Sequence, residues 1–319
     1  MEQEKTFEEQ LEAVENKIKD SQENLGDVEV RDAMLEKASL QQKYNKYEDA
    51  IKTYIDTLPK SIGIGKKMDV HFLILQIYLK QRNLEKFKEH LNQQQILLDQ
   101  GGDWERKNRL KVYEGIYCLM IRDITKACKL FLDSVATFNS SEIISYNEIV
   151  SYTVLTSMIC LDRQSLKKKV HQNPEVVGVL RENQVLKSFL ESFLQCDYKT
   201  LFQKFAIVNE NLSHDQYLSI HRKYLIREYR VVFYSQFLES YKTVTLNNMA
   251  KAFGVTVQFI DRELSELISS RRINCKIDKV AGIIESSRAD DRNQLYNNLI
   301  KQGDYLLNRV QKLSRLTDL

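Results

Sequence analysis

Thr-Leu-Asn-Asn-Met-Ala-Lys-Ala-Phe-Gly-Val-Thr, at residues 245–256, contains a short amphipathic helix and the tight turn that follows it. The apolar residues of this helix recur every three or four positions and share one face: Leu246, Met249, Ala250 and Phe253. This spacing matches the 3.6-residue helical repeat. Gly254 supplies the left-handed conformation that ends a helix, and Thr256 is a favoured N-cap for a second one. The stretch therefore predicts a helix-turn-helix.

The residues that follow extend this helix-turn-helix to a winged helix. The second helix carries apolar residues on one face: Ile260, Leu264, Leu267 and Ile268. Ile273, Cys275 and Ile277 then alternate with polar residues, and residues 282–285 follow a short turn, so we expect a small β-hairpin. A long helix at residues 224–241 precedes the motif, and another at residues 290–316 closes the chain.

Upstream of the winged helix, a polar turn followed by a new helix recurs at a regular interval. The turns start at Asn45, Arg82, Arg122, Asp162 and Cys196, in steps of 37, 40, 40 and 34 residues. This is the period of tetratricopeptide-like solenoids, in which each helix pair buries its apolar face on the next pair. The match is to the period alone, so a plain helical bundle remains the alternative.

The first forty residues form an acidic arm with 5 basic and 12 acidic side chains. Its apolar residues form a narrow stripe with helical spacing: Phe7, Leu11, Val14, Ile18 and Leu25. Such a stripe is buried only against another helix, either the chain's own or a partner's. We therefore expect an amphipathic helical arm (1–37), a helical-repeat solenoid (38–220), a winged-helix domain (221–289) and a C-terminal helix (290–319).

The composition favours a mostly α-helical protein. The chain of 319 residues has only 2 prolines and 10 glycines, too few for the turns of a many-stranded sandwich or barrel. No apolar run approaches the ~18 residues of a membrane span, and residues 1–4 lack the basic and then apolar pattern of a secretory signal. We expect a protein of the cytoplasm and nucleus that does not bind membranes.

The sequence offers no catalytic, cofactor-binding or metal-binding constellation. The five histidines and five cysteines show no metal-ligand spacing, and no nucleophile elbow or phosphate-binding glycine loop is present. Residues 101–109 concentrate charge around the only tryptophan, Trp104. An active site would need a nucleophile or paired acids in a pocket. We therefore expect Trp104 to be a buried packing anchor in a structural loop.

A winged helix also suggests DNA binding, with the second helix in the major groove. Here that helix carries Asp261, Glu263 and Glu266 against a single Arg262. Acidic side chains are repelled by phosphates. Although residues 221–319 hold 17 basic against 11 acidic residues, we do not expect nucleic acid as a partner.

A solenoid that leads into a winged helix and a terminal helix resembles the PCI-domain proteins, which are scaffolds of the proteasome lid, the signalosome and a translation initiation factor. Gly-Gly-Asp-Trp-Glu-Arg at residues 101–106 is similar to the 26S proteasome non-ATPase regulatory subunit 6 family. Further similar stretches lie at residues 109–115, 238–241, 252–255, 275–280 and 303–307. Members of this family carry a longer helical region before the repeats, and Arg-Pro-Asp where this chain has Arg288-Ala289-Asp290.

The resemblance implies a non-catalytic scaffold subunit of the proteasome regulatory particle lid, without a cofactor. Its implied partners are other PCI-domain lid subunits and a small acidic disordered lid protein. The corresponding subunit of the cullin-deneddylating signalosome is an alternative within the same class. A nucleic-acid-binding winged-helix protein is the alternative from a different class.

Two surfaces are candidates for partner binding. The first is the edge of the winged-helix hairpin, because the alternating Ile273, Cys275 and Ile277 are more apolar residues than its inner face requires. Arg271 and Arg272, which precede them, belong to the same candidate surface. The second is the terminal helix, where a heptad seam passes through Gly303: Tyr296, Leu299, Leu306, Val310 and Leu313. We predict that both surfaces contact neighbouring subunits.

Overall fold

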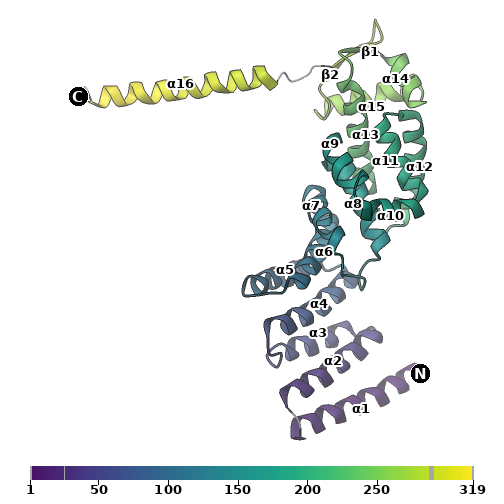
Figure 1. Cartoon of the computed structure of the whole chain (residues 1–319), viewed down its shortest axis with the longest axis vertical. Coiled ribbons are helices and arrows are strands. Elements are labelled where there is room, and N and C mark those ends of the chain that lie inside the picture. Colours follow the sequence, from purple (N-terminus) through teal and green to yellow (C-terminus); the bar gives the residue numbers. More distant parts are fainter. Residues whose placement is uncertain (1, 25, 287–290, 318–319) are drawn as a thin grey trace. The chain divides into compact units, whose positions relative to one another are not determined.

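The computed structural model describes residues 2–24, 26–286 and 291–317, and these are helical apart from short turns and one small sheet (Figure 1). Two compact units divide the chain. The first unit is Met1–Lys187 with Leu212–His221, and the second is Ser188–Asn211 with Arg222–Leu319. A mostly α fold with helical repeats and a winged helix is thereby confirmed.

Consecutive helices of the repeat region are joined by short turns. In order along the chain they are α1 (Glu2–Asn24), α2 (Asp27–Lys43), α3 (Tyr47–Thr57), α4 (Ile64–Gln81), α5 (Leu84–Asp99), α6 (Trp104–Ile121), α7 (Ile124–Ser134), η1 (Val135–Thr137), α8 (Tyr146–Cys160), α9 (Arg163–Leu166), η2 (Lys167–His171), α10 (Pro174–Glu182), α11 (Gln184–Gln195), α12 (Tyr198–His214) and η3 (Ser219–His221). The spacing of the predicted turns matches the start of α3, α5, α7, α9 and α12.

The turns repeat because one backbone device recurs. A residue in the left-handed conformation ends the helix before each of four turns: Asn45, Arg82, Arg122 and Cys196. In each case the next N–H donates to the carbonyl five residues earlier, as in Asn83 to Tyr78 at 3.1 Å and Asp123 to Cys118 at 2.9 Å. This is the Schellman closure of a helix. The turn at Asp162 differs, since its backbone is extended.

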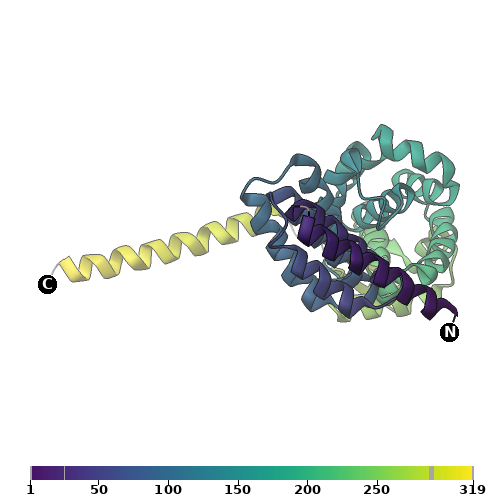
Figure 2. The ribbon, with the colours of Figure 1, turned by 90° about the horizontal axis from the view of Figure 1, so that it is seen from below.

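The acidic arm packs on the chain's own next helix. Helices α1 and α2, both purple, lie side by side (Figure 2). Val14 is buried, and Lys37 pairs with Glu15 at 2.7 Å across the two helices. Leu25 and the side chain of Phe7 lie outside the described residues. Leu11 and Ile18 are half-buried, so the chain's own helices cover the described part of the stripe only in part.

The winged helix forms as predicted, with one additional strand. Its elements are α13 (Arg222–Glu239), β1 (Thr243–Thr245), α14 (Leu246–Phe253), α15 (Val257–Ser269), β2 (Cys275–Asp278) and β3 (Ile283–Ser286), followed by α16 (Asp291–Thr317). The three strands are antiparallel in the order β1-β3-β2. Gly254 ends α14 at φ 67°, the left-handed conformation that its residue type favours.

An aromatic cluster joins the winged helix to the helices before it. Phe189 on α11 packs edge-on against Phe233 on α13, with ring centroids 6.1 Å apart. Phe202 on α12 packs against Phe253 of α14 at 5.0 Å. Phe253 also contacts Phe237 at 5.3 Å. Because aromatic pairs add stabilisation beyond the area that they bury, α11 to α14 share one core.

Candidate interaction surfaces

The apolar side of the hairpin faces inward, which corrects one prediction. Ile273 and Cys275 are only 6% and 5% exposed, and Ile284 on β3 is fully buried. Ile277 is half-buried. The alternation in this segment therefore fills the core of the winged helix, and Ile273 and Cys275 are not surface residues. What the hairpin leaves open are the outer edges of β1 and β2, because β3 lies between them.

The two arginines before the hairpin have different surroundings. Arg272 pairs with Glu228 of α13 at 2.9 Å, and the Glu228 side chain is 11% exposed. Arg271 is exposed and takes a left-handed conformation at φ 55°, which ends α15. Arg272 thus neutralises a largely buried carboxylate inside the winged helix. Both arginines are exposed, and Arg272 is the one that is tied to α13.

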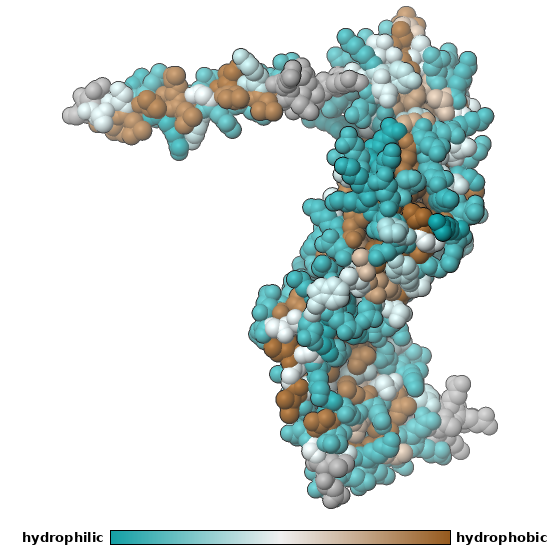
Figure 3. Space-filling model, viewed as in Figure 1, coloured by the Kyte–Doolittle hydropathy of each residue, from teal (hydrophilic) through white to brown (hydrophobic). Residues whose placement is uncertain are grey.

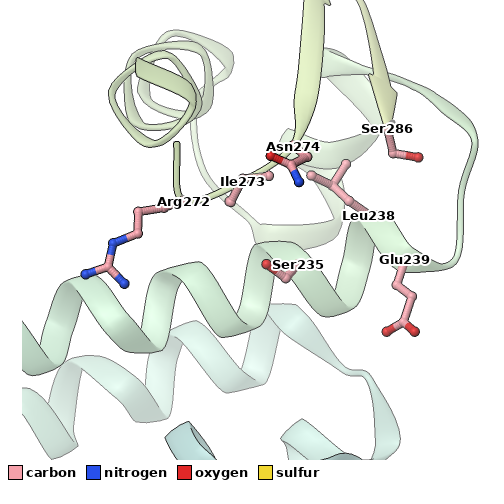
Figure 4. Close-up of a pocket in the computed structure, with 7 residues that line it drawn as sticks. All are labelled: Ser235, Leu238, Glu239, Arg272, Ile273, Asn274 and Ser286. Atoms are coloured by element: carbon pink, nitrogen blue, oxygen red, sulfur yellow. The ribbon is translucent and has the colours of Figure 1, made fainter. Parts of the chain in front are cut away.

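A cavity of about 320 Å³ opens beside these residues (Figure 4). Its lining comes from the end of α13, the segment before β2 and the end of β3: Ser235, Leu238, Glu239, Arg272, Ile273, Asn274 and Ser286. Two of these side chains, Leu238 and Ile273, are apolar, and the other five are polar or charged. None of the seven is a histidine or cysteine.

The acidic residues of α15 are held in ion pairs within the winged helix. Asp261 pairs with Lys279 of the hairpin turn at 3.2 Å, and Glu263 pairs with Arg230 of α13 at 2.7 Å. These contacts explain why the helix in the reading position of a helix-turn-helix carries acids. The charges fix α15 against its neighbours, and the exposed Glu266 pairs with Arg262 of the same helix at 3.3 Å.

Trp104 is the first residue of α6 and is not a buried anchor for the loop before this helix. The Trp104 side chain is 68% exposed, which contradicts the expectation of burial. Arg106 instead holds the start of α6, since its guanidinium pairs with Asp69 of α4 at 2.7 Å and with the N-cap residue Asp103. Arg109 pairs with Glu142. Because charge pairs secure the loop, the tryptophan is left on the surface as a candidate contact.

The terminal helix α16 exposes its whole apolar seam (Figure 3). The five predicted residues are each 60–70% exposed: Tyr296, Leu299, Leu306, Val310 and Leu313. A Cβ added at Gly303 would meet no neighbouring atom within 4 Å. Leu295, Ile300 and Leu307 are also exposed and widen the stripe to an arc of roughly 140° at 100° per residue. The sequence prediction did not include these three.

Two further properties of the described residues bear on function. Among the described helices, none is long and apolar enough to cross a membrane. In the same part of the chain, no three histidine, cysteine, aspartate or glutamate side chains come together to hold a metal ion.

Helical repeats that share a core with a winged helix, followed by a helix with an exposed apolar stripe, define the class of PCI-domain scaffold proteins. Residues 182–288 match the PCI domain family. Residues 1–169 match the family described as 26S proteasome subunit RPN7, and residues 296–316 match the RPN7/PSMD6 C-terminal helix. The chain belongs to the 26S proteasome regulatory subunit RPN7/PSMD6 family.

Members of this family from Arabidopsis thaliana and Saccharomyces cerevisiae are similar in sequence to nearly the whole chain. The 26S proteasome non-ATPase regulatory subunit 6 homolog of Arabidopsis thaliana is 49% identical over 312 residues, which cover 98% of this chain and 81% of that protein. The regulatory subunit RPN7 of Saccharomyces cerevisiae is 37% identical over 310 residues, covering 93% and 72%. Subunit 1 of the COP9 signalosome complex of Arabidopsis thaliana is 26% identical over 198 residues, covering 61% and 45%. The resemblance to the proteasome family is thus confirmed.

Proposed function

We propose that this chain is a non-catalytic scaffold subunit of the 26S proteasome regulatory particle lid and acts in ubiquitin-dependent protein degradation. The observation that carries the proposal is the apolar stripe of α16, which no other described element covers. Monomeric proteins rarely expose contiguous apolar patches of this kind. The stripe lies on the helix that matches the family's own C-terminal helix.

The width of the stripe favours a bundle over a two-stranded coiled coil. A two-stranded seam needs only the a and d positions, which here are occupied by the series from Tyr296 to Leu313. Leu295, Ile300 and Leu307 flank that seam and are equally open to solvent. A helix with apolar flanks on both sides of its seam contacts more than one neighbour. We therefore assign α16 to a bundle with the terminal helices of several lid subunits.

The winged helix supplies the second contact through the open edges of its sheet. The outer edges of β1 and β2 present backbone N–H and C=O groups that pair readily with another strand. Arg271, exposed beside β2, adds positive charge at this edge. The partners that fit are other PCI-domain lid subunits placed side by side. A small acidic disordered lid protein would complement the surplus of basic residues in residues 221–319. We place the assembled particle in the cytoplasm and nucleus.

Removal of α16 tests the proposal. A chain that ends at Asp290 is co-expressed with the other lid subunits, and the assembled lid is measured by native mass spectrometry. The circular dichroism of the shortened chain should show that the repeats and winged helix stay folded. The shortened chain should still pair with one neighbouring subunit, but no complete lid should form. Assembly of the shortened chain at the yield of the full chain would contradict the bundle role.

The same mass spectra separate the alternatives. Full-length chain purified with its endogenous complexes should bring down lid subunits and not signalosome subunits. Duplex DNA at physiological salt should not shift in a gel at submicromolar chain. A stable shift there would favour the nucleic-acid-binding alternative, which the paired acids of α15 oppose.

A further inference from the structure

The segment that joins α12 to α13 packs on the repeat helices of the first unit. Residues 215–221, called here the connecting segment, lie in the stretch Leu212–His221, which belongs to the first unit. The helices on either side of it lie wholly or mostly in the second unit. Tyr217 and Leu218 of the connecting segment are only 6% and 2% exposed. Its hydrogen bonds to the repeat helices join residues 63 to 134 positions apart along the chain.

Asp215 makes the central contact of the connecting segment. Its Oδ2 accepts a hydrogen bond from the Tyr152 hydroxyl of α8 at 2.8 Å. Its Oδ1 accepts from the backbone N–H groups of Tyr217 and Leu218 at 2.8 and 2.7 Å. The ring of Tyr152, which is 4% exposed, also packs edge-on against Tyr217, with centroids 6.3 Å apart. Because hydrogen bonds to a carboxylate are stronger than those between neutral groups, this one side chain both shapes the segment and binds it to α8.

Two further hydrogen bonds tie the connecting segment to α6 and α4. His221 Nε2 lies 2.8 Å from the carbonyl oxygen of Met120, near the end of α6. The nitrogen donates, because a carbonyl oxygen only accepts. The turn after α6 closes on the carbonyls of the two residues before Met120, so His221 satisfies a further carbonyl at this helix end. At the end of α4, the Arg82 guanidinium donates to the Gln216 carbonyl oxygen at 3.4 Å.

The three helices that hold the connecting segment are equivalent members of three consecutive repeats. Each of α4, α6 and α8 is the helix that precedes one of the regularly spaced turns, which start at Arg82, Arg122 and Asp162. Repeat arrays bind other chains along surfaces to which successive repeats contribute. The connecting segment contacts the array as such a bound chain does, with a charged anchor, two buried side chains and a hydrogen bond to each of the three helices.

We propose that α4, α6 and α8 form a peptide-binding site, and that the connecting segment fills this site as an intramolecular ligand. The ligand that the site selects is a short segment that turns at an aspartate and carries a tyrosine and a leucine two and three residues later. A partner segment of this kind binds only after the connecting segment has left. A tethered ligand has an effective concentration on the order of 1 mM, so the intact chain keeps the site closed to weak competitors. The site lies outside both surfaces that we assign to lid assembly.

A peptide with the sequence of residues 212–222 tests the site. The peptide is labelled with fluorescein, and its binding to the full chain is measured by fluorescence anisotropy. The double change Asp215→Ala and Tyr217→Ala weakens the hold of the connecting segment and leaves the repeat helices unchanged. We expect this variant to bind the peptide at least about tenfold more tightly than the wild-type chain, because the tethered competitor is weakened.

The matched control is the double change Gln216→Ala and Ile220→Ala. Both side chains are exposed, and the hydrogen bond from Arg82 goes to the backbone carbonyl of Gln216. The control variant should therefore bind the peptide as weakly as the wild-type chain does.

Two further changes make the test specific. A peptide with alanine in place of its aspartate should not bind, and Tyr152→Phe added to the Asp215 and Tyr217 variant should weaken binding of the original peptide. The proposal is overturned if that variant stays folded by circular dichroism and binds the peptide no more tightly than the control, or if the alanine peptide binds equally well. It is also overturned if the variant loses its helical signal, because the connecting segment is then part of the folding core and not a ligand.

Discussion

Replacing Leu299 and Leu306 of α16 by alanine should weaken binding of this chain to the rest of the lid without unfolding it. Full burial of a leucine contributes about 1.5–3 kcal/mol. In the isolated chain the two side chains are 63% and 60% exposed, so a partner has the larger part still to bury. Each leucine then contributes about 1–2 kcal/mol to binding, and the pair about 2–4 kcal/mol. That loss corresponds to roughly 30- to 700-fold in Kd.

The measurement is a titration of the labelled full chain against a lid preparation that lacks this subunit. A matched control is the double change Lys301→Ala and Asn308→Ala, which lies on the polar face of the same helix and is equally exposed. Alanine favours helix at all four positions, so circular dichroism should show the same helicity for both variants. Only the leucine variant should lose affinity.

Two results would refute the reasoning. Wild-type affinity of the leucine variant would mean that the apolar stripe stays in solvent after assembly. Equal losses of affinity in the leucine and control variants would mean that the contribution of α16 to binding does not depend on burial of its apolar face.

Three further outcomes follow from individual contacts. Trp104→Ala should change the free energy of unfolding by less than about 0.5 kcal/mol, because Trp104 is mostly exposed, but should remove one lid contact worth about 2 kcal/mol. Arg272→Glu should lower the stability of the winged helix by about 1–2 kcal/mol in urea unfolding, since Glu228 loses its partner, whereas Arg271→Glu should leave stability unchanged and weaken binding. Burial lowers the pKa of His71 from 6.5 to about 4. Between those pH values the unfolded chain binds a proton that the folded chain does not, so stability should fall by up to about 3 kcal/mol as the pH decreases, and His71→Leu should flatten that dependence.

Each of these outcomes has a clear contradiction. A large drop in melting temperature for Trp104→Ala would show that Trp104 stabilises the fold by packing. Equal unfolding curves for the Arg271 and Arg272 variants would show that the pair with Glu228 does not stabilise the winged helix. An unchanged pH profile for His71→Leu would assign the acid sensitivity to other groups.

The sequence predicts those parts of this fold that have local signals. Gly254 marks the turn of the winged helix because a left-handed residue is needed there. The sequence does not predict strand β1, because it has only three residues, of which Val244 alone is buried. Its pairing with β3 is also long-range, so it leaves no local signal. Alternation placed Ile273 and Cys275 on one face but could not tell whether the chain or a partner covers that face. The exposure of Trp104 had no local signal, because the contacts that hold this segment, Arg106 with Asp69 and Arg109 with Glu142, join residues 37 and 33 positions apart.

The aromatic cluster of the second unit limits how this protein can be divided or exchanged. Phe189 and Phe202 come from helices that precede the winged helix in sequence, yet they pack on the rings of Phe233 and Phe253 inside it. A gene fragment that began at the winged helix would encode a core that lacks the rings of Phe189 and Phe202. Recombination that transfers this winged helix to another chain must therefore carry α11 and α12 with it. The unit that can be exchanged between proteins is therefore larger than the winged helix alone.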